Sequence, residues 1–263
     1  MFFVTHAAQG LATWAESGSR QKTYKVLQHE GFHQFAWNYL GPNLPVWVNE
    51  GLAQYFEDAV IVNDRMTLGL VGRSRVERVR QAIDHRDVLA LPTLMQVGTG
   101  QWSATLRHDP DRSALLYAQS WSVVYYLIHG DGGKHQGAFL DYLKLLNRGN
   151  RTDQAELLSF GTAGLAGVER DWLRYAADQR PNDVTTATDR LEFLGTGLRL
   201  LDEQGRPMPE TLDELRTELQ RFGFSLRRRE LGVTQNQSAT DAELFGFTRG
   251  GEEGAGFEAD FVL

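Results

Sequence analysis

The chain has 263 residues, of which 41% are hydrophobic and 23% charged, and its net charge is -7 at pH 7. This composition is typical of a soluble globular protein with a substantial core, and the acidic balance argues against general nucleic-acid binding. The absence of cysteine excludes disulfides, thiolate metal sites and cysteine catalysis. No apolar run is long enough to span a bilayer, so we expect no transmembrane segment.

The first chemically informative segment is HEGFH at residues 29–33, within a helix expected over residues 22–40. Residues four apart on a helix share one face, so His29 and His33 can offer imidazole nitrogens to a single ion. A catalytic zinc takes three protein ligands and leaves one position for water. Glu30 projects next to that face and fits the general base that activates the water.

A second helix is expected over residues 46–60. Pro42 and Pro45 break the first helix, and the apolar pattern of residues 47–56 then restarts a helical face that carries Glu50. A helix, a turn and a returning helix would bring Glu50 beside the two histidines. The alternative is that both histidines are ordinary core or surface residues and that Glu50 is a solvated charge.

The sequence WVNEGLAQYF at residues 47–56, following HEGFH, resembles the gluzincins, which are zinc peptidases whose third ligand is a glutamate. It is most similar to the bacterial peptidase MA-like families and more distantly to the aminopeptidase and leukotriene-hydrolase group. This resemblance implies that zinc is the cofactor and that Glu30 is general base and acid. It implies three zinc ligands: His29, His33 and Glu50.

The resemblance also favours an exported or periplasmic protein over a cytoplasmic one. Residues 1–4 nevertheless lack the basic flank and apolar core of a signal peptide. Peptidases of this clan carry a small sheet ahead of the zinc helices, and residues 1–28 are short for it. We therefore expect an N-terminal sheet that is either short or missing, the second case being a domain truncated at its front.

Another departure from the family concerns Gln54, four residues after Glu50. Thermolysin-like relatives have an aspartate there that orients a histidine, so the hydrogen-bond partner of His29 is left open. The glycine-rich motif that holds the substrate's amino terminus in the aminopeptidases is also missing from residues 1–28. The sequence therefore favours an endopeptidase or an unassigned specificity.

Tyr117 is the candidate oxyanion donor. The segment from Tyr117 to Leu127 is similar to the gluzincin segment that begins with a catalytic tyrosine and continues as a helix, expected here over residues 117–129. A phenol in that place donates a hydrogen bond to the oxygen that gains negative charge. The alternative is an aromatic residue at a helix start that only packs on the core.

The remaining elements of the first domain are mainly helical. Ser74 and Glu77 have capping-box spacing for a helix over residues 75–86. Residues 89–101 contain proline and glycine among apolar residues, which predicts a packed loop, either a connector or a contributor to substrate recognition. Further helices are expected over residues 136–147, 152–160 and 167–178.

A polar stretch at residues 180–183 predicts a boundary between a metallopeptidase domain, residues 1–180, and a small α+β unit, residues 181–263. In the second unit, Thr211 and Glu214 have capping-box spacing for a helix that ends at Gly223. Residues 224–227 and 244–248 are expected to form short strands.

These patterns predict a mainly α protein with a small α+β C-terminal part, whose first domain is gluzincin-like. We expect a zinc-dependent peptidase that acts on a peptide or protein substrate. The alternative is a non-catalytic scaffold or binding module that is stabilised by zinc and keeps the peptidase fold. Hydrolysis of a non-peptide substrate, such as an ester or epoxide, is a third possibility, and the sequence does not predict the oligomeric state.

Overall fold

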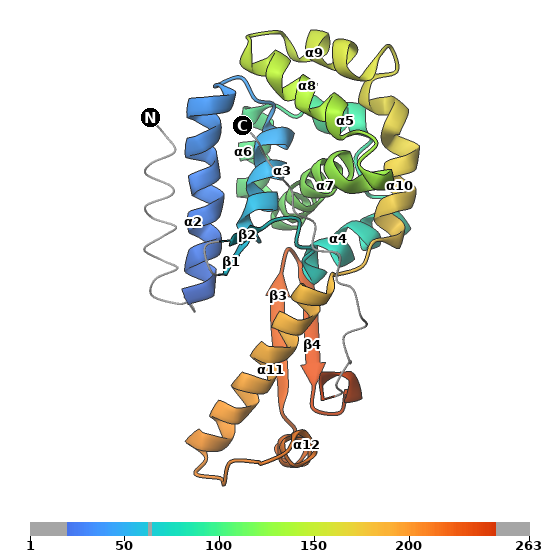
Figure 1. The fold of residues 1–263 in the computed structure, drawn as a ribbon. Coiled ribbons are helices and arrows are strands. Elements are labelled where there is room, and N and C mark those ends of the chain that lie inside the picture. The colour runs from blue at the N-terminus through green and yellow to red at the C-terminus, as the bar shows by residue number, and fades with distance from the viewer. Residues whose placement is uncertain (1–19, 63–64, 246–263) are drawn as a thin grey trace. The chain divides into compact units, whose positions relative to one another are not determined.

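The computed structural model describes residues 20–62 and 65–245 (Figure 1). The described chain is mainly helical, with two short antiparallel hairpins, which confirms the predicted fold class. Its strands are β1 (Val60–Val62), β2 (Arg65–Thr67), β3 (Ser225–Glu230) and β4 (Val233–Ser238). Its helices are α2 (Arg20–Phe35), the π-helix η1 (Ala36–Leu40), α3 (Val46–Glu57), α4 (Arg73–Asp84), α5 (Leu91–Met95), α6 (Thr99–His108), α7 (Pro110–His129), η2 (Gly130–Gly132), α8 (Gln136–Asn147), α9 (Thr152–Phe160), η3 (Gly164–Val168), α10 (Glu169–Asp178), α11 (Asp183–Glu203), α12 (Leu212–Arg221) and η4 (Ala242–Leu244).

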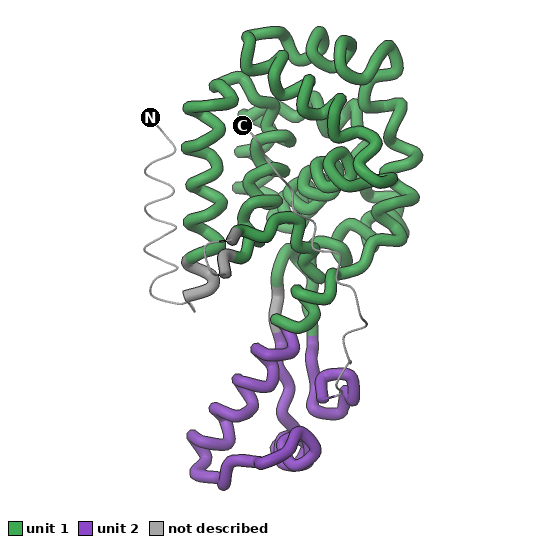
Figure 2. Tube along the Cα trace, viewed as in Figure 1, with its two compact units in different colours: residues 1–188, 228–235 green, residues 189–227, 236–263 purple. Residues whose placement is uncertain are grey.

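The chain divides into two compact units, coloured separately in Figure 2. Among the described residues, unit 1 runs to residue 188 and includes residues 228–235, whereas unit 2 contains residues 189–227 and the segment from 236 onward. The predicted division after residue 180 stays a prediction. None of the helices in the described ranges is both long and apolar enough to cross a membrane.

The helices α3 and α7 form the centre of unit 1. Most of α7 from Leu115 to Leu127 is buried, on every side of the helix, which is the pattern of a helix enclosed by others. A β-carbon added to Gly51 of α3 would lie 2.6 Å from the carbonyl oxygen of Ser120 on α7. The two backbones therefore approach closely, directly beside the position of Glu50.

The helix α2 runs antiparallel to α3. The Phe32 and Phe56 rings stack with their centroids 5.1 Å apart, and Gln28 Nε2 donates to the carbonyl oxygen of Ala59 at 2.9 Å. Residues earlier in α2 thus face residues later in or after α3. The connection is the π-helix η1 and a turn in which Gly41 has a φ of 91°, a conformation that favours glycine.

Two local predictions about unit 1 are wrong, and one element of it was not predicted. The expected loop at residues 89–101 contains α5 and the start of α6: Pro92 lies in the first turn of α5 and Gly98 is the N-cap of α6, both favourable places at helix starts. Ser74 does not cap α4, because its hydroxyl donates to Glu230 Oε2 at 2.8 Å. The hairpin of β1 and β2, with Val60 paired to Thr67, was not predicted.

The helix α7 also begins earlier than predicted, at Pro110, and Tyr117 lies inside it. The Asp109 side chain caps this helix by accepting from the backbone N–H of Arg112 at 2.9 Å. Asp109 and Pro110 are favourable N-cap and first-turn residues, so they are the start signal. The apolar periodicity used for the prediction begins only later in the helix.

Unit 2 combines α11 and α12 with part of the β3–β4 hairpin around a small core that includes Phe193, Leu201 and Leu219. The predicted cap of α12 is confirmed, since Thr211 Oγ1 accepts from the backbone N–H of Glu214 at 3.1 Å. The strand expected at 224–227 lies within β3 apart from its first residue. The strand expected at 244–248 is wrong at its first residue, because Leu244 is the last residue of η4. Residues 246–248 lie outside the described residues.

Candidate metal centre

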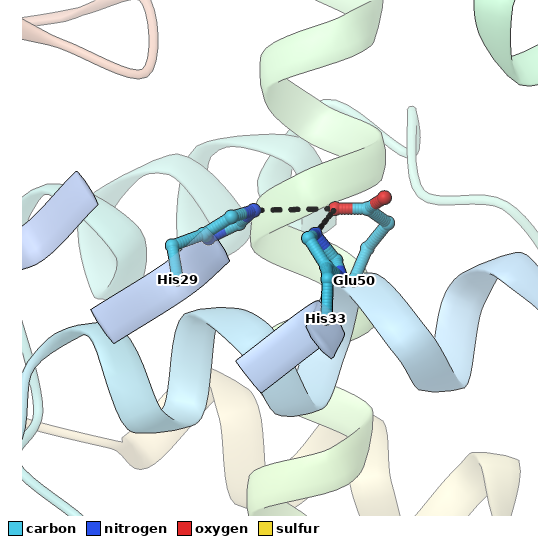
Figure 3. A group of neighbouring side chains, drawn as sticks. All are labelled: His29, His33 and Glu50. Carbon is cyan, nitrogen blue, oxygen red and sulfur yellow. Dashed lines mark ion pairs between the residues drawn. The ribbon is translucent and has the colours of Figure 1, made fainter. Parts of the chain in front are cut away.

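The antiparallel pair of α2 and α3 brings the three predicted metal ligands together (Figure 3). The Nε2 atoms of His29 and His33 lie 3.5 Å and 3.7 Å from Glu50 Oε2. One nitrogen or oxygen atom from each of the three residues falls within 4.8 Å of the other two. All three side chains are mostly buried, with exposed fractions of 17%, 15% and 12% for His29, His33 and Glu50.

A hydrogen bond at the other ring nitrogen fixes the orientation of each imidazole. His29 Nδ1 lies 3.0 Å from Glu57 Oε2, and His33 Nδ1 lies 3.2 Å from Asn49 Oδ1. Both partners are oxygen acceptors, so both Nδ1 atoms carry the hydrogen. In the neutral rings this leaves the lone pairs on the Nε2 atoms, which face Glu50 and are available to a metal.

The arrangement fits a divalent metal ion. Two ligand atoms that each lie about 2.1 Å from a tetrahedral zinc are about 3.4 Å apart, close to the two observed separations. Glu50 Oε2 is buried and has no hydrogen-bond partner among the residues that the structure describes, although an unpaired buried carboxylate oxygen is costly. A cation between the three atoms would supply the missing partner. Histidine nitrogen and carboxylate oxygen are both ordinary zinc ligands.

The charges around His29 are strongly coupled. Burial lowers the pKa of His29, but the nearby carboxylates of Glu50 and Glu57 outweigh it and raise that pKa to about 9. Burial raises the pKa of Glu57, and the charges of Arg75 and His29 outweigh it and lower that pKa to about 2. Without metal, a proton on His29 partly balances the carboxylates at neutral pH, and a metal ion would replace that proton.

Glu30 and Tyr117 lie close to this centre. Glu30 follows His29 on α2 and is half-buried. Burial raises the pKa of Tyr117, and the negative charges of Glu50 and Glu30 act on the phenol in the same direction. Tyr117 therefore stays protonated at neutral pH and can donate a hydrogen bond. Its ring also packs edge-to-face on the buried Trp102, with the centroids 5.1 Å apart.

Residues 24–150 match a family described as a protein of unknown function, DUF1570. The matched segment contains all five predicted site residues. No curated protein and no solved structure matches the chain. The comparisons therefore give a domain family for just under half of the chain, and they name neither a reaction nor a metal.

Asn49 and Glu57, the hydrogen-bond partners of the two histidines, were not predicted from the sequence. Asn49 belongs to the quoted motif, but nothing in its position alone assigns it to His33. Glu57 stands two helical turns after Glu50 on α3, so it lies on the same face of that helix. That spacing is a signal that could have indicated Glu57 as the partner of His29.

Proposed function

We propose that this protein is a zinc-dependent peptidase of the gluzincin type. The observation that carries the proposal is the convergence of His29, His33 and Glu50, with both imidazoles oriented by separate acceptors and with Glu30 next to the first ligand. A scaffold site needs three or four ligands but no adjacent base. The half-buried Glu30 therefore favours catalysis over a purely structural metal site.

The residues have separate roles in the proposed hydrolysis. Zinc bound here would polarise the scissile carbonyl and lower the pKa of a water molecule. Glu30 takes a proton from the attacking water and passes it to the leaving amine. Tyr117 donates a hydrogen bond to the carbonyl oxygen as negative charge develops on it. Glu57 and Asn49 hold the two imidazoles in the orientation that binding requires.

The test is the Glu30→Gln variant, assayed for zinc content and for turnover of a quenched peptide library in the same samples. Glutamine keeps the shape of the side chain but accepts no proton. We expect one zinc per chain and a loss of hydrolysis of at least about 100-fold, the usual contribution of a general base.

Glu77→Gln is the matched control, because Glu77 is a half-buried glutamate on α4 that has no place in the site. It should retain both zinc and turnover. If the wild type, Glu30→Gln and Glu77→Gln all bind zinc but no turnover depends on Glu30, the result would favour the non-catalytic scaffold. Wild-type turnover in Glu30→Gln would exclude Glu30 as the base, and absence of zinc from the wild-type protein would exclude the metal site.

A further inference from the structure

Arg75, on α4, lies outside the proposed ligand set but reaches toward it. Its side chain is only 4% exposed. Its Nη2 lies 2.9 Å from Glu57 Oε1, and its Nε donates to Gln54 Oε1 at 2.8 Å. Its Nη1 donates to Asp58 Oδ2. The three nitrogens of one guanidinium thus hold three side chains from the end of α3 and the residue after it.

We propose that Arg75 is a positioning residue for the metal centre, which acts on His29 through Glu57. The inference rests on the metal site of the proposed function, but it does not depend on which reaction that site catalyses. It assigns a role to Arg75, which lies on α4 and belongs to neither of the two zinc-binding sequence motifs.

The two oxygens of Glu57 show how the positioning works. Oε1 accepts from Arg75, whereas Oε2 accepts from His29 Nδ1 at 3.0 Å. The carboxylate is planar, so an arginine that fixes Oε1 also fixes the direction in which Oε2 points. Because His29 Nδ1 donates to Oε2, the orientation of Glu57 sets the orientation of the ring and of its metal-facing Nε2.

Arg75 is itself held on several sides. Its Nε donates a hydrogen bond to Gln54 Oε1. Its guanidinium lies over the ring of the fully buried Trp121, 5.8 Å from the ring centroid. Gln54 occupies the place where thermolysin-like relatives have an aspartate. In the described part of the chain, Gln54 makes no hydrogen bond to His29. It binds Arg75 instead, and Arg75 in turn holds Glu57.

The local charges balance around this arrangement. Lys25 Nζ lies 2.8 Å from Asp58 Oδ1, so Arg75 and Lys25 face the two carboxylates of Glu57 and Asp58. Two consecutive buried carboxylates repel each other unless cations lie between or beside them. Without Arg75, Glu57 would lose the donor that holds its Oε1 and would turn. That rotation removes a well-aligned acceptor from His29 Nδ1.

A purely structural role for Arg75, tying α4 to α3, is the competing explanation, and a double-mutant cycle separates the two. The full-length chain is prepared with Arg75→Gln, with Glu57→Gln and with both changes. Zinc affinity is measured by competition with a chromophoric chelator, and the melting temperature is measured without metal. Arg78→Gln is the matched control, since Arg78 lies on the same helix and bonds a backbone carbonyl of Asp111.

We expect each single variant to weaken zinc binding by about 10- to 100-fold, the usual effect of losing a partner of a metal-binding histidine. In the Glu57→Gln background, Arg75→Gln should weaken zinc binding little further, because its effect passes through Glu57. Arg75→Lys, which keeps the charge but loses the planar fork, should fall between wild type and Arg75→Gln. Arg78→Gln should bind zinc like the wild type.

The inference would be overturned if Arg75→Gln weakened zinc binding equally in the wild-type and Glu57→Gln backgrounds. It would also be overturned if Arg75→Gln bound zinc with wild-type affinity. If Arg75→Gln does not fold, Arg75→Lys replaces it in the same cycle and the same two outcomes apply. The zinc affinities could agree with the expected cycle while the protein shows no Glu30-dependent turnover. That result would support this inference and reject the peptidase. A wild-type protein that binds no zinc would reject both.

Discussion

At the level of single residues, the hydroxyl of Tyr117 distinguishes its catalytic role from a packing role. Burial raises the pKa of the phenol and the charges of nearby carboxylates act in the same direction, so it is a hydrogen-bond donor at neutral pH. Its ring packs on Trp102, which would also suit a residue that only fills the core. The aromatic ring is needed for either role, whereas the hydroxyl is needed only for catalysis.

Tyr117→Phe therefore removes the hydroxyl and keeps the packing. If the phenol stabilises the oxyanion, kcat should fall by about 100- to 1000-fold, as for other single donors of this kind, while zinc content and melting temperature stay unchanged. Steady-state kinetics on a cleaved peptide, with metal analysis, would measure this.

Tyr142→Phe is the control for this experiment. Tyr142 is fully buried on α8, and its hydroxyl has no hydrogen-bond partner among the described residues. Its loss should leave kcat unchanged. If Tyr117→Phe behaved like Tyr142→Phe, the catalytic role of Tyr117 would be rejected and the packing role retained.

At the scale of helices, α3 links the core to the metal centre. One side of it carries Glu50 and Glu57, and another meets α7 at Gly51, where an added β-carbon would lie 2.6 Å from Ser120 O and 2.7 Å from a methyl carbon of Val124. Close packing against α7 therefore sets the position of Glu50. A larger residue at Gly51 would have to push the two helices apart.

We expect Gly51→Ala to destabilise the metal-free protein by about 1–3 kcal/mol, the usual cost of overpacking, and to weaken zinc binding. Urea unfolding and chelator competition would measure the two effects. Gly31→Ala is the control, because among the described residues no atom outside the nearby backbone of α2 lies within 4 Å of an added β-carbon at this position.

Gly31→Ala should instead stabilise the protein by up to about 1 kcal/mol, since alanine favours a helix over glycine. Stabilisation by both changes would show that α3 and α7 accommodate the extra methyl group. The position of Glu50 would then not depend on this close contact.

At the scale of the molecule, the described residues contain separate hydrophobic cores in the two units. The core of unit 1 extends from Phe32 to Ala176 and includes residues of both α3 and α7, whereas that of unit 2 is much smaller. The proposed metal ligands all belong to unit 1. Metal binding should therefore stabilise one unit directly and leave the other unchanged.

Calorimetry of the full chain should show two unfolding transitions, of which zinc raises only one. At a free zinc concentration of 100 times Kd, the added stability would be about 2.7 kcal/mol. The Glu50→Ala variant is the control and should show no zinc-dependent shift. A single transition that moves as a whole with zinc would show that the two units unfold together.

Much of this arrangement could be predicted from local sequence. The spacing of His29 and His33 follows from helix periodicity, and the prolines before Trp47 predict a returning helix that places Glu50 nearby. The structure brings these three residues together as expected. Helix starts were harder to predict, because proline and glycine at residues 92 and 98 can break a helix or begin one, and packing of the flanking apolar residues decides between them.

Short-range spacing along the chain thus predicts the mainly helical class, the candidate ligands and the candidate base. The contacts of Glu57 with His29, of Asn49 with His33 and of Arg75 with Glu57 form only when the helices pack together. The physical reason is that a hydrogen bond requires a specific distance and direction between two atoms. Between separate helices, packing of the apolar core sets both, and no local pattern records it.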